Sequence, residues 1–370
     1  MRVPLVDLVA QQREIADEVG PRLQAVFDSA AFIGGAAVTE FEDAYARHIG
    51  VEHVVGVANG TDALELALRA AGVGVADEVI VPANTFIATV EAVSRIGAVP
   101  VLVDVDARQL LIDPVEAERA ITARTKAIVP VHLFGQTAPM ERLSKLSEEY
   151  GVVLVEDAAQ AQGARRSGRP AGGFGIAAGT SFYPGKNLGA AGDAGAVLSN
   201  DADVAARVRT IAAHGSDRKY VHDVVGFNSR LDAVQAVVLH AKLGRLTEWN
   251  RLRRNAAARY VELLADVGGL GLPVSDPMND DVWHLFVVQV DERDRVLAEL
   301  NAAGIGAGIH YPTPVHLTGA YAHLGRGVGD FPTTEAAAQR ILSLPLYPHI
   351  TAHQQEYVAD VLTRACRPRP

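Results

Sequence analysis

From about residue 54 to residue 200, short apolar runs alternate with amphipathic stretches. The runs are rich in Val, Ile and Leu, which is typical of strands buried on both faces of a parallel sheet. The stretches between them carry apolar residues at helical spacing. Together they predict a mostly parallel central sheet with helices on both faces. We expect strands at VVGV (54–57), EVIVP (78–82), PVLVDVD (100–106), AIVPVHLF (127–134), VVLVED (152–157), GTSFYP (179–184) and GAVLSN (195–200), and helices at 61–71, 86–96 and 140–150.

The pattern changes after residue 200, where helical stretches dominate. A long helix or helix pair is expected at 231–260, with a break near Gly244, and a boundary in the Gly/Pro/Asp-rich segment 260–282. A strand at 284–290 and later helices then predict a smaller C-terminal α/β lobe. We therefore expect a large domain over residues 1–245, including an N-terminal segment, and a smaller domain over 246–370. The helices outside the large sheet are expected at 201–213, 293–303, 333–342 and 351–364.

Composition excludes several classes of function. The 370 residues carry a net charge of −10, which argues against bulk nucleic-acid binding. The single cysteine, Cys366, allows neither an intramolecular disulfide nor a cysteine zinc cluster, and the 12 histidines show no ligand spacing, so no metal is expected. No signal-type N-terminus and no apolar run of membrane-spanning length are evident, and we expect a cytoplasmic protein without membrane contact.

The segment SFYPGKNLGAAGDAGAV (181–197) places Lys186 between a predicted strand and a Gly-rich loop. Small neighbours leave room for a bound group, and a lysine in such a pocket can form an imine with an aldehyde cofactor. The alternative interpretation is an ordinary lysine in a surface loop.

The segment VVLVEDAAQAQGA (152–164) ends a predicted strand with Asp157. Ligands of open α/β sheets bind beyond such strand ends, and a carboxylate there suits a protonated pyridine nitrogen. The alternative is an aspartate that caps the next helix.

The segment VANGTDALELAL (57–68) runs from a strand through Gly60 and Thr61 into a helix, whose free amides suit a phosphate. A capped helix start without a ligand is the alternative. Ser181 offers a second hydroxyl for the phosphate, or simply lines a strand, and Phe86 would stack on a cofactor ring or pack in the core. The order of phosphate cradle, carboxylate and lysine along the chain is more specific than any of the three alone.

Six motifs in this order resemble the DegT/DnrJ/EryC1/StrS sugar aminotransferases, which are fold-type I enzymes that depend on pyridoxal 5'-phosphate (PLP). They are NGTDAL, VPANTFIAT, EDAAQAQGA, SFYPGKNLGA, GFNSRLDAVQA and GIHYPTPVHL, within a resemblance that spans residues 4–348. It implies that Lys186 holds PLP as a Schiff base and that Asp157 pairs with the pyridine nitrogen. It also places Gln160 near the phenolic oxygen, Phe86 on the ring, and Gly60, Thr61 and Ser181 on the phosphate. In a homodimer with shared active sites, Asn228 would reach the phosphate of the neighbouring subunit.

The resemblance also implies a substrate. Gln160, Tyr183 and Pro184 favour the branch that aminates C3 of a dTDP-linked 3-keto-6-deoxyhexose, with L-glutamate as donor and pyridoxamine 5'-phosphate as the alternate cofactor form. Gln162 departs from this branch, in which histidine is expected. Lysine rather than histidine at position 186 separates the chain from relatives that perform deoxygenation.

Five further residues are candidates for binding the substrate. Lys219 and Tyr220 offer a cation and a hydroxyl for a diphosphate. His310, Tyr311 and His316 are candidates for the sugar pocket, although loop histidines are often merely solvated. The competing functions are a 4-keto-sugar aminotransferase, a cyclitol aminotransferase, a PLP-binding regulator and a scaffold without a cofactor.

Overall fold

The computed structural model of this protein describes residues 1–367 and has a seven-stranded sheet at its centre. The strands lie in the order β1-β9-β8-β5-β4-β2-β3. Only β9 runs antiparallel to its neighbours, and the other adjacent pairs are parallel, as predicted. The strands are β1 (His53–Val57), β2 (Glu78–Pro82), β3 (Val99–Val103), β4 (Thr125–Ile128), β5 (Val153–Asp157), β8 (Ala177–Ser181) and β9 (Gly195–Ser199).

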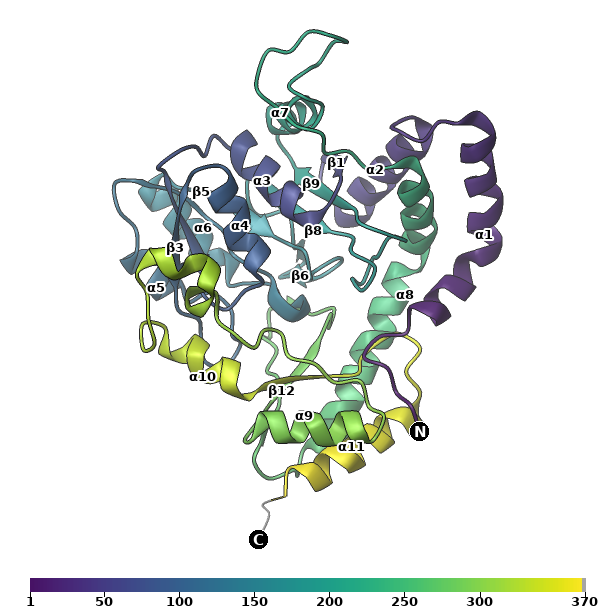
Figure 1. Ribbon diagram of the computed structural model, residues 1–370, viewed down its shortest axis with the longest axis vertical. Helices are drawn as coiled ribbons and strands as arrows, with labels where there is room; N and C mark the ends of the chain where they lie inside the picture. The colour runs from purple at the N-terminus through teal and green to yellow at the C-terminus, as the bar shows by residue number, and fades with distance from the viewer. Residues whose placement is uncertain (368–370) are drawn as a thin grey trace.

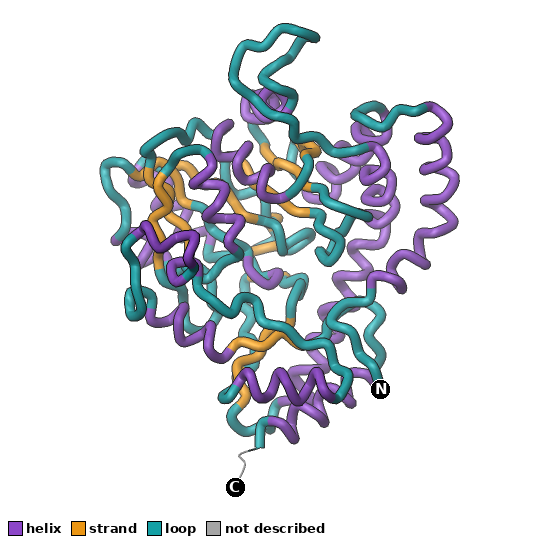
Figure 2. The backbone as a smooth tube through the Cα atoms, viewed as in Figure 1, coloured by secondary structure: helices purple, strands orange, loops and turns teal. Residues whose placement is uncertain are grey.

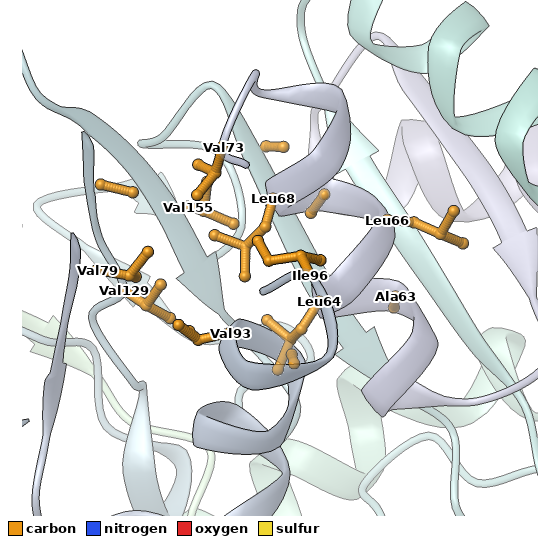
Figure 3. Close-up of a cluster of buried hydrophobic side chains, with 14 of the residues drawn as sticks. Ala63, Leu64, Leu66, Leu68, Val73, Val79, Val93, Ile96, Val129 and Val155 are labelled. Carbon is orange, nitrogen blue, oxygen red and sulfur yellow. The ribbon is translucent and has the colours of Figure 1, made fainter. Parts of the chain in front are cut away.

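Helices cover both faces of this sheet (Figures 1 and 2). Leu64 and Leu68 of one helix pack against Val79 and Val155 of the sheet (Figure 3). Leu154, next to Val155, belongs to the core on the opposite face. This alternation explains why the strands read as continuous apolar runs. One face carries α3 (Gly60–Ala70), α4 (Ile87–Arg95) and α7 (Ala202–Ala212), and the other carries α2 (Ala36–Ile49), α5 (Pro114–Arg119), α6 (Met140–Tyr150) and part of α8 (Ala233–Leu264).

A smaller lobe has its own core and an antiparallel sheet in the order β10-β12-β13. Val3 pairs with Ile305, so the chain start belongs to this lobe. The predicted smaller C-terminal α/β lobe is thus present. Its elements are β10 (Leu270–Gly271), β12 (Phe286–Val290), α9 (Arg293–Ala302), α10 (Pro332–Arg340), β13 (Ile341–Leu344) and α11 (Ala352–Ala365). The 3-10 turns at Val315–Leu317 and Gly319–Leu324 pack against the core of the large sheet.

The long helix α8 joins the two lobes. The break expected near Gly244 is absent, because a single exposed glycine within 32 helical residues costs too little to end a helix. The helix passes through residue 245 without interruption, so both lobes share it at the division expected there. Helix α1 (Leu8–Ser29), for which the sequence analysis assigned no element, packs along α8.

The remaining differences concern strand ends. The strand expected over 127–134 ends at Ile128, and a 3-10 turn follows at Leu133–Gly135. Pro130 lacks an amide hydrogen for the ladder, and Phe134 has a positive φ of 63°.

A small three-stranded sheet links β6 (Arg165–Arg166), β7 (Arg169–Pro170) and β11 (Asn279–Asp280). Within residues 1–367, no helix is both long and apolar enough to cross a membrane.

Candidate active site

A pocket of about 470 Å³ lies between the central sheet and the small lobe. Asp157 and Ser181, which end β5 and β8, both line it. Open α/β sheets bind their ligands at this edge, beyond the carboxyl ends of parallel strands. The residues predicted from sequence that line the pocket are Gly60, Thr61, Phe86, Asp157, Gln160, Ser181, Tyr183, Lys186, His310 and Tyr311.

The N-terminus of α3 forms one wall of the pocket. Asn59 caps the helix by accepting a hydrogen bond of 2.8 Å from the amide of Asp62. The first amides of a helix lack acceptors within the helix, and the helix dipole favours an anion beside them. Gly60 allows α3 to approach β8, because a Cβ at this position would lie 2.6 Å from the Cβ of Ser181. The wall therefore offers main-chain amides and the hydroxyls of Thr61 and Ser181 to a phosphate.

Asp157 is held by two hydrogen bonds and is 5% exposed. Its Oδ2 accepts from the Thr89 hydroxyl at 2.7 Å, and its Oδ1 accepts from the Ala159 amide at 3.1 Å. Since Thr89 gives its proton to Asp157, Thr85 is the donor in the 2.7 Å contact between the two threonines. Burial raises the pKa of Asp157, while the bonds from Thr89 and Ala159 act in the opposite direction. A cationic N–H partner would favour the ionised carboxylate further.

Lys186 lies in the loop that follows β8. The loop is tightly folded, since a Cβ at Gly189 would lie 2.2 Å from the carbonyl oxygen of Pro184. Lys242 also donates a hydrogen bond of 2.7 Å to the Gly189 carbonyl. Burial lowers the pKa of Lys186 to about 8, although the charge of Asp157 opposes this effect. At neutral pH the amine is thus uncharged more often than an ordinary lysine, and the uncharged form attacks an aldehyde.

Gln160 is fixed in one orientation by two contacts. Its Oε1 accepts from the Phe134 amide at 2.6 Å, and its Nε2 donates to the Tyr311 hydroxyl at 3.2 Å. The Tyr311 ring in turn lies 5.1 Å from the ring of Phe86. Phe86 is 48% exposed, which excludes the alternative that it is a core aromatic and leaves its face open to a ligand.

A model of the DegT/DnrJ/EryC1/StrS aminotransferase family matches residues 13–363. The chain belongs to this family. It is 45% identical to the dTDP-3-amino-3,4,6-trideoxy-alpha-D-glucose transaminase of Streptomyces venezuelae, over 98% of this chain and 95% of that protein. It is 46% identical to the erythromycin biosynthesis sensory transduction protein EryC1 of Saccharopolyspora erythraea, over 98% and 99% of the two chains. The crystal structure of S. venezuelae DesV in complex with a ketimine intermediate matches with a TM-score of 0.97 and 45% identity over 100% of both chains.

These similarities confirm the predicted family and fold, and they make the protein a PLP-dependent sugar aminotransferase. The pocket fits the cofactor. Asp157, held in place by Thr89 and Ala159, would suit a pyridine nitrogen, and Lys186, with its lowered pKa, would suit an aldehyde. The cradle at Gly60 leaves no room for a side chain but has the amides and hydroxyls that a phosphate requires.

Three predicted residues lie outside the pocket of their own chain. Lys219 and Tyr220 belong to the segment between α7 and α8, which projects from the body of the protein on the side away from the small lobe (Figure 1), whereas Asn228 lies at the base of this segment, where it pairs with Ala213. The Tyr220 side chain is 82% exposed, and the Asn228 side chain accepts a hydrogen bond of 3.0 Å from Arg230.

His316 is also absent from the pocket lining, which corrects the expectation that it lines the sugar pocket of its own chain. Its imidazole is buried against the ring of Phe331, at 4.6 Å between centroids. Its Nε2 lies 3.1 Å from Oε1 of Glu335. The side chain therefore belongs to the packing of the 315–335 segment.

The pocket also contains residues that the sequence analysis did not single out. The threonines that orient Asp157 stand in the same PANTFIAT segment as Phe86, so their proximity was the available signal. The others come from the N-terminus, from the residues just before β12, and from the loop before β9, where Asp193 lies within the segment 181–197 but was not singled out. The additional pocket residues include Thr85, Thr89, Asp193, His284, Leu5 and Val6.

Proposed function

We propose that this chain transfers an amino group from L-glutamate to C3 of a dTDP-linked 3-keto-6-deoxyhexose. One observation carries the chemistry: Lys186, Asp157 and the N-terminus of α3 converge on one pocket, although they come from three separate segments of the sequence. The sugar is inferred from the name of the S. venezuelae transaminase and from Gln160, Tyr183 and Pro184.

Bound PLP supplies an electron sink for negative charge on the carbon that loses a proton. Lys186 anchors the cofactor and carries that proton between the substrate carbon and the cofactor carbon. Asp157 keeps a proton on the ring nitrogen, for which its hydrogen bonds from Thr89 and Ala159 prepare it. Gln160 would contact the phenolic oxygen, Phe86 the ring, and Gly60, Thr61 and Ser181 the phosphate.

We also propose that the enzyme works as a homodimer with shared active sites. Asn228 would then contact the phosphate in the partner's pocket, and Lys219 and Tyr220 would contact the substrate diphosphate there. The support is that none of the three lines the pocket of its own chain, and that Lys219 and Tyr220 lie on a segment that projects from the body of the protein. His310, Tyr311 and Tyr183 remain candidates for the sugar side of the pocket.

Regiochemistry is the finest part of the proposal. Gln162, which departs from the expected histidine, is 1% exposed and donates to Thr180 and to the carbonyl of Ser181. It therefore acts on a ligand only through the backbone that carries Ser181. This indirect role makes the substitution compatible with amination at C3.

A reverse half-reaction tests the proposal. The protein is loaded with PLP, and a dTDP-3-amino- or dTDP-4-amino-6-deoxyhexose is added while the visible absorption of the bound cofactor is followed. We expect loss of absorption with the 3-amino sugar and with L-glutamate, and none in Lys186→Ala. A response to the 4-amino sugar alone would replace the C3 assignment by C4. A response to glutamate alone would indicate another acceptor such as a cyclitol, and no response at all would favour a PLP-binding regulator.

A further inference from the structure

His284 precedes β12 and lines the pocket together with Lys186. The residue is 8% exposed, and its Nδ1 lies 3.2 Å from Oδ1 of Asn187. Neutral histidine carries one ring proton, and the atom that holds it decides whether the other nitrogen is a donor or an acceptor. The contacts around Asn187 determine this position.

The side-chain amide of Asn187 has only one orientation that satisfies its neighbours. Its Nδ2 donates to the carbonyl of Val282 at 2.9 Å and to Oδ1 of Asn250 at 2.9 Å. Asn250 is fixed in the same way, because its Nδ2 donates to the carbonyl of Gln162 at 2.9 Å. A carbonyl only accepts, so the amide nitrogen of Asn187 faces Val282 and its oxygen faces His284. Nδ1 of His284 therefore carries the proton.

The second ring nitrogen of His284 has no proton. Burial lowers the pKa of His284 well below its usual value, and the positive charges of Lys186 and Arg253 act in the same direction, as does His310. With Nδ1 protonated and the ring neutral, Nε2 keeps a lone pair. Among residues 1–367, no donor is hydrogen-bonded to this Nε2.

Lys186 lacks acceptors for the hydrogen bonds that it can donate. An ε-ammonium group has three donors, and within the described chain none of them has a hydrogen-bond acceptor. The oxygens of Asp157, the carboxylate whose charge acts on Lys186, already accept from Thr89 and Ala159. Nε2 of His284 is an unused acceptor in the same pocket.

We propose that His284 is a positioning residue for Lys186: its Nε2 accepts a hydrogen bond from the ε-ammonium group whenever this lysine is not joined to the cofactor. The bond holds the freed group on the small-lobe side of the pocket, from which it returns its proton to the substrate. The inference rests on the proposed function only for the role of Lys186.

The acidity of Lys186 tests the inference directly. The chain has five lysines, at 126, 145, 186, 219 and 242, so lysine labelled with ¹³C at Cε gives a spectrum that single substitutions assign. The full-length protein is saturated with pyridoxamine phosphate, which leaves Lys186 free, and is titrated. Lys242 is the internal control, because its partner is the Gly189 carbonyl and not His284.

Two substitutions of His284 test the roles of its two ring nitrogens separately. His284→Asn keeps a donor near the position of Nδ1 but removes the acceptor at Nε2. We expect the pKa of Lys186 to fall by about one pH unit, a tenfold change in its acid constant, because the charged form loses a hydrogen bond. His284→Gln, whose amide oxygen reaches the position of Nε2, should restore most of the wild-type value, and Lys242 should not shift in either variant.

An unchanged pKa of Lys186 in His284→Asn would overturn the inference. A raised pKa would also overturn it, because it would mean that His284 carries a positive charge. If both variants fail to fold, ¹⁵N spectra of the histidines in the unaltered protein decide, and a proton on Nε2 of His284 refutes the proposal. Failure of pyridoxamine phosphate to bind would refute the proposed function instead, and the ¹⁵N measurement remains valid without the cofactor.

Discussion

Thr89 shows how a residue with no reacting group shapes the site. It donates to Asp157 and accepts from Thr85, so a directed pair of hydrogen bonds ends on the carboxylate. All three side chains are buried, where an unpaired polar group is costly. The pair therefore fixes the rotamer of Asp157 and favours its ionised form.

Thr89→Val keeps the shape of the side chain and removes the hydroxyl. Because the hydrogen bond from Thr89 lowers the pKa of Asp157, its loss should raise that pKa and move the acid limb of the kcat–pH profile upward. We expect kcat to fall by about tenfold, since one hydrogen bond to a charged group is lost. Thr89→Ser is the matched control and should keep both kcat and the acid limb near their wild-type values. An acid limb that stays in place in Thr89→Val would contradict the role assigned to Thr89.

At the scale of elements, the close approach of α3 to β8 builds the phosphate cradle. A Cβ at Gly60 meets Ser181, and a Cβ at Gly195 would lie 2.4 Å from the carbonyl oxygen of Asn59. Glycine at both places lets the helix N-terminus reach the strand ends, so the amides and the Ser181 hydroxyl act on one anion.

Gly60→Ala should force α3 away from β8. We expect a loss of about 1–3 kcal/mol in the free energy of unfolding and weaker PLP binding, because overpacking shifts the backbone of the cradle. Thermal unfolding and a PLP titration measure the two effects. Gly244→Ala is the control, since a Cβ there meets nothing within 4 Å and should add roughly 0.5–1 kcal/mol of helix stability. Unchanged PLP affinity in Gly60→Ala would be inconsistent with the cradle.

At the scale of the whole molecule, the pocket of one chain contains most of the predicted site residues but not all of them. The other predicted cofactor residues line the pocket, whereas Asn228, Lys219 and Tyr220 do not. Sharing of sites between two chains would bring these residues to a partner's ligand, and a two-fold axis would complete both pockets at once.

Subunit mixing tests this arrangement. When each variant is measured separately, Lys186→Ala is expected to be inactive and Asn228→Ala to have reduced activity. In a mixed dimer, one pocket combines the intact Lys186 of one chain with the intact Asn228 of the other. Random mixing should therefore restore about a quarter of the wild-type sites if the dimer is two-fold symmetric. No gain over the separate variants, in samples where mass spectrometry shows mixed dimers, would place Asn228 outside the partner's site.

The sequence alone predicted the sheet and the small lobe, and it indicated the residues that we propose to hold the cofactor. Continuous apolar runs report burial on both faces, and each main cofactor group stands in a local motif at a strand end or helix start. Local order along the chain was therefore sufficient for β5, β8, α3 and the residues they present, such as Asp157 and Gly60.

Only the tertiary structure decided the rest. Hydrogen bonds between segments distant in sequence set the orientation of Gln160 through Tyr311 and the tautomer of His284 through Asn187 and Val282. The same holds for His316, which reads as a site residue but packs in the interior. Local sequence does not show which distant residue forms a hydrogen bond with a buried polar group, because the two residues come into contact only when the two lobes pack together.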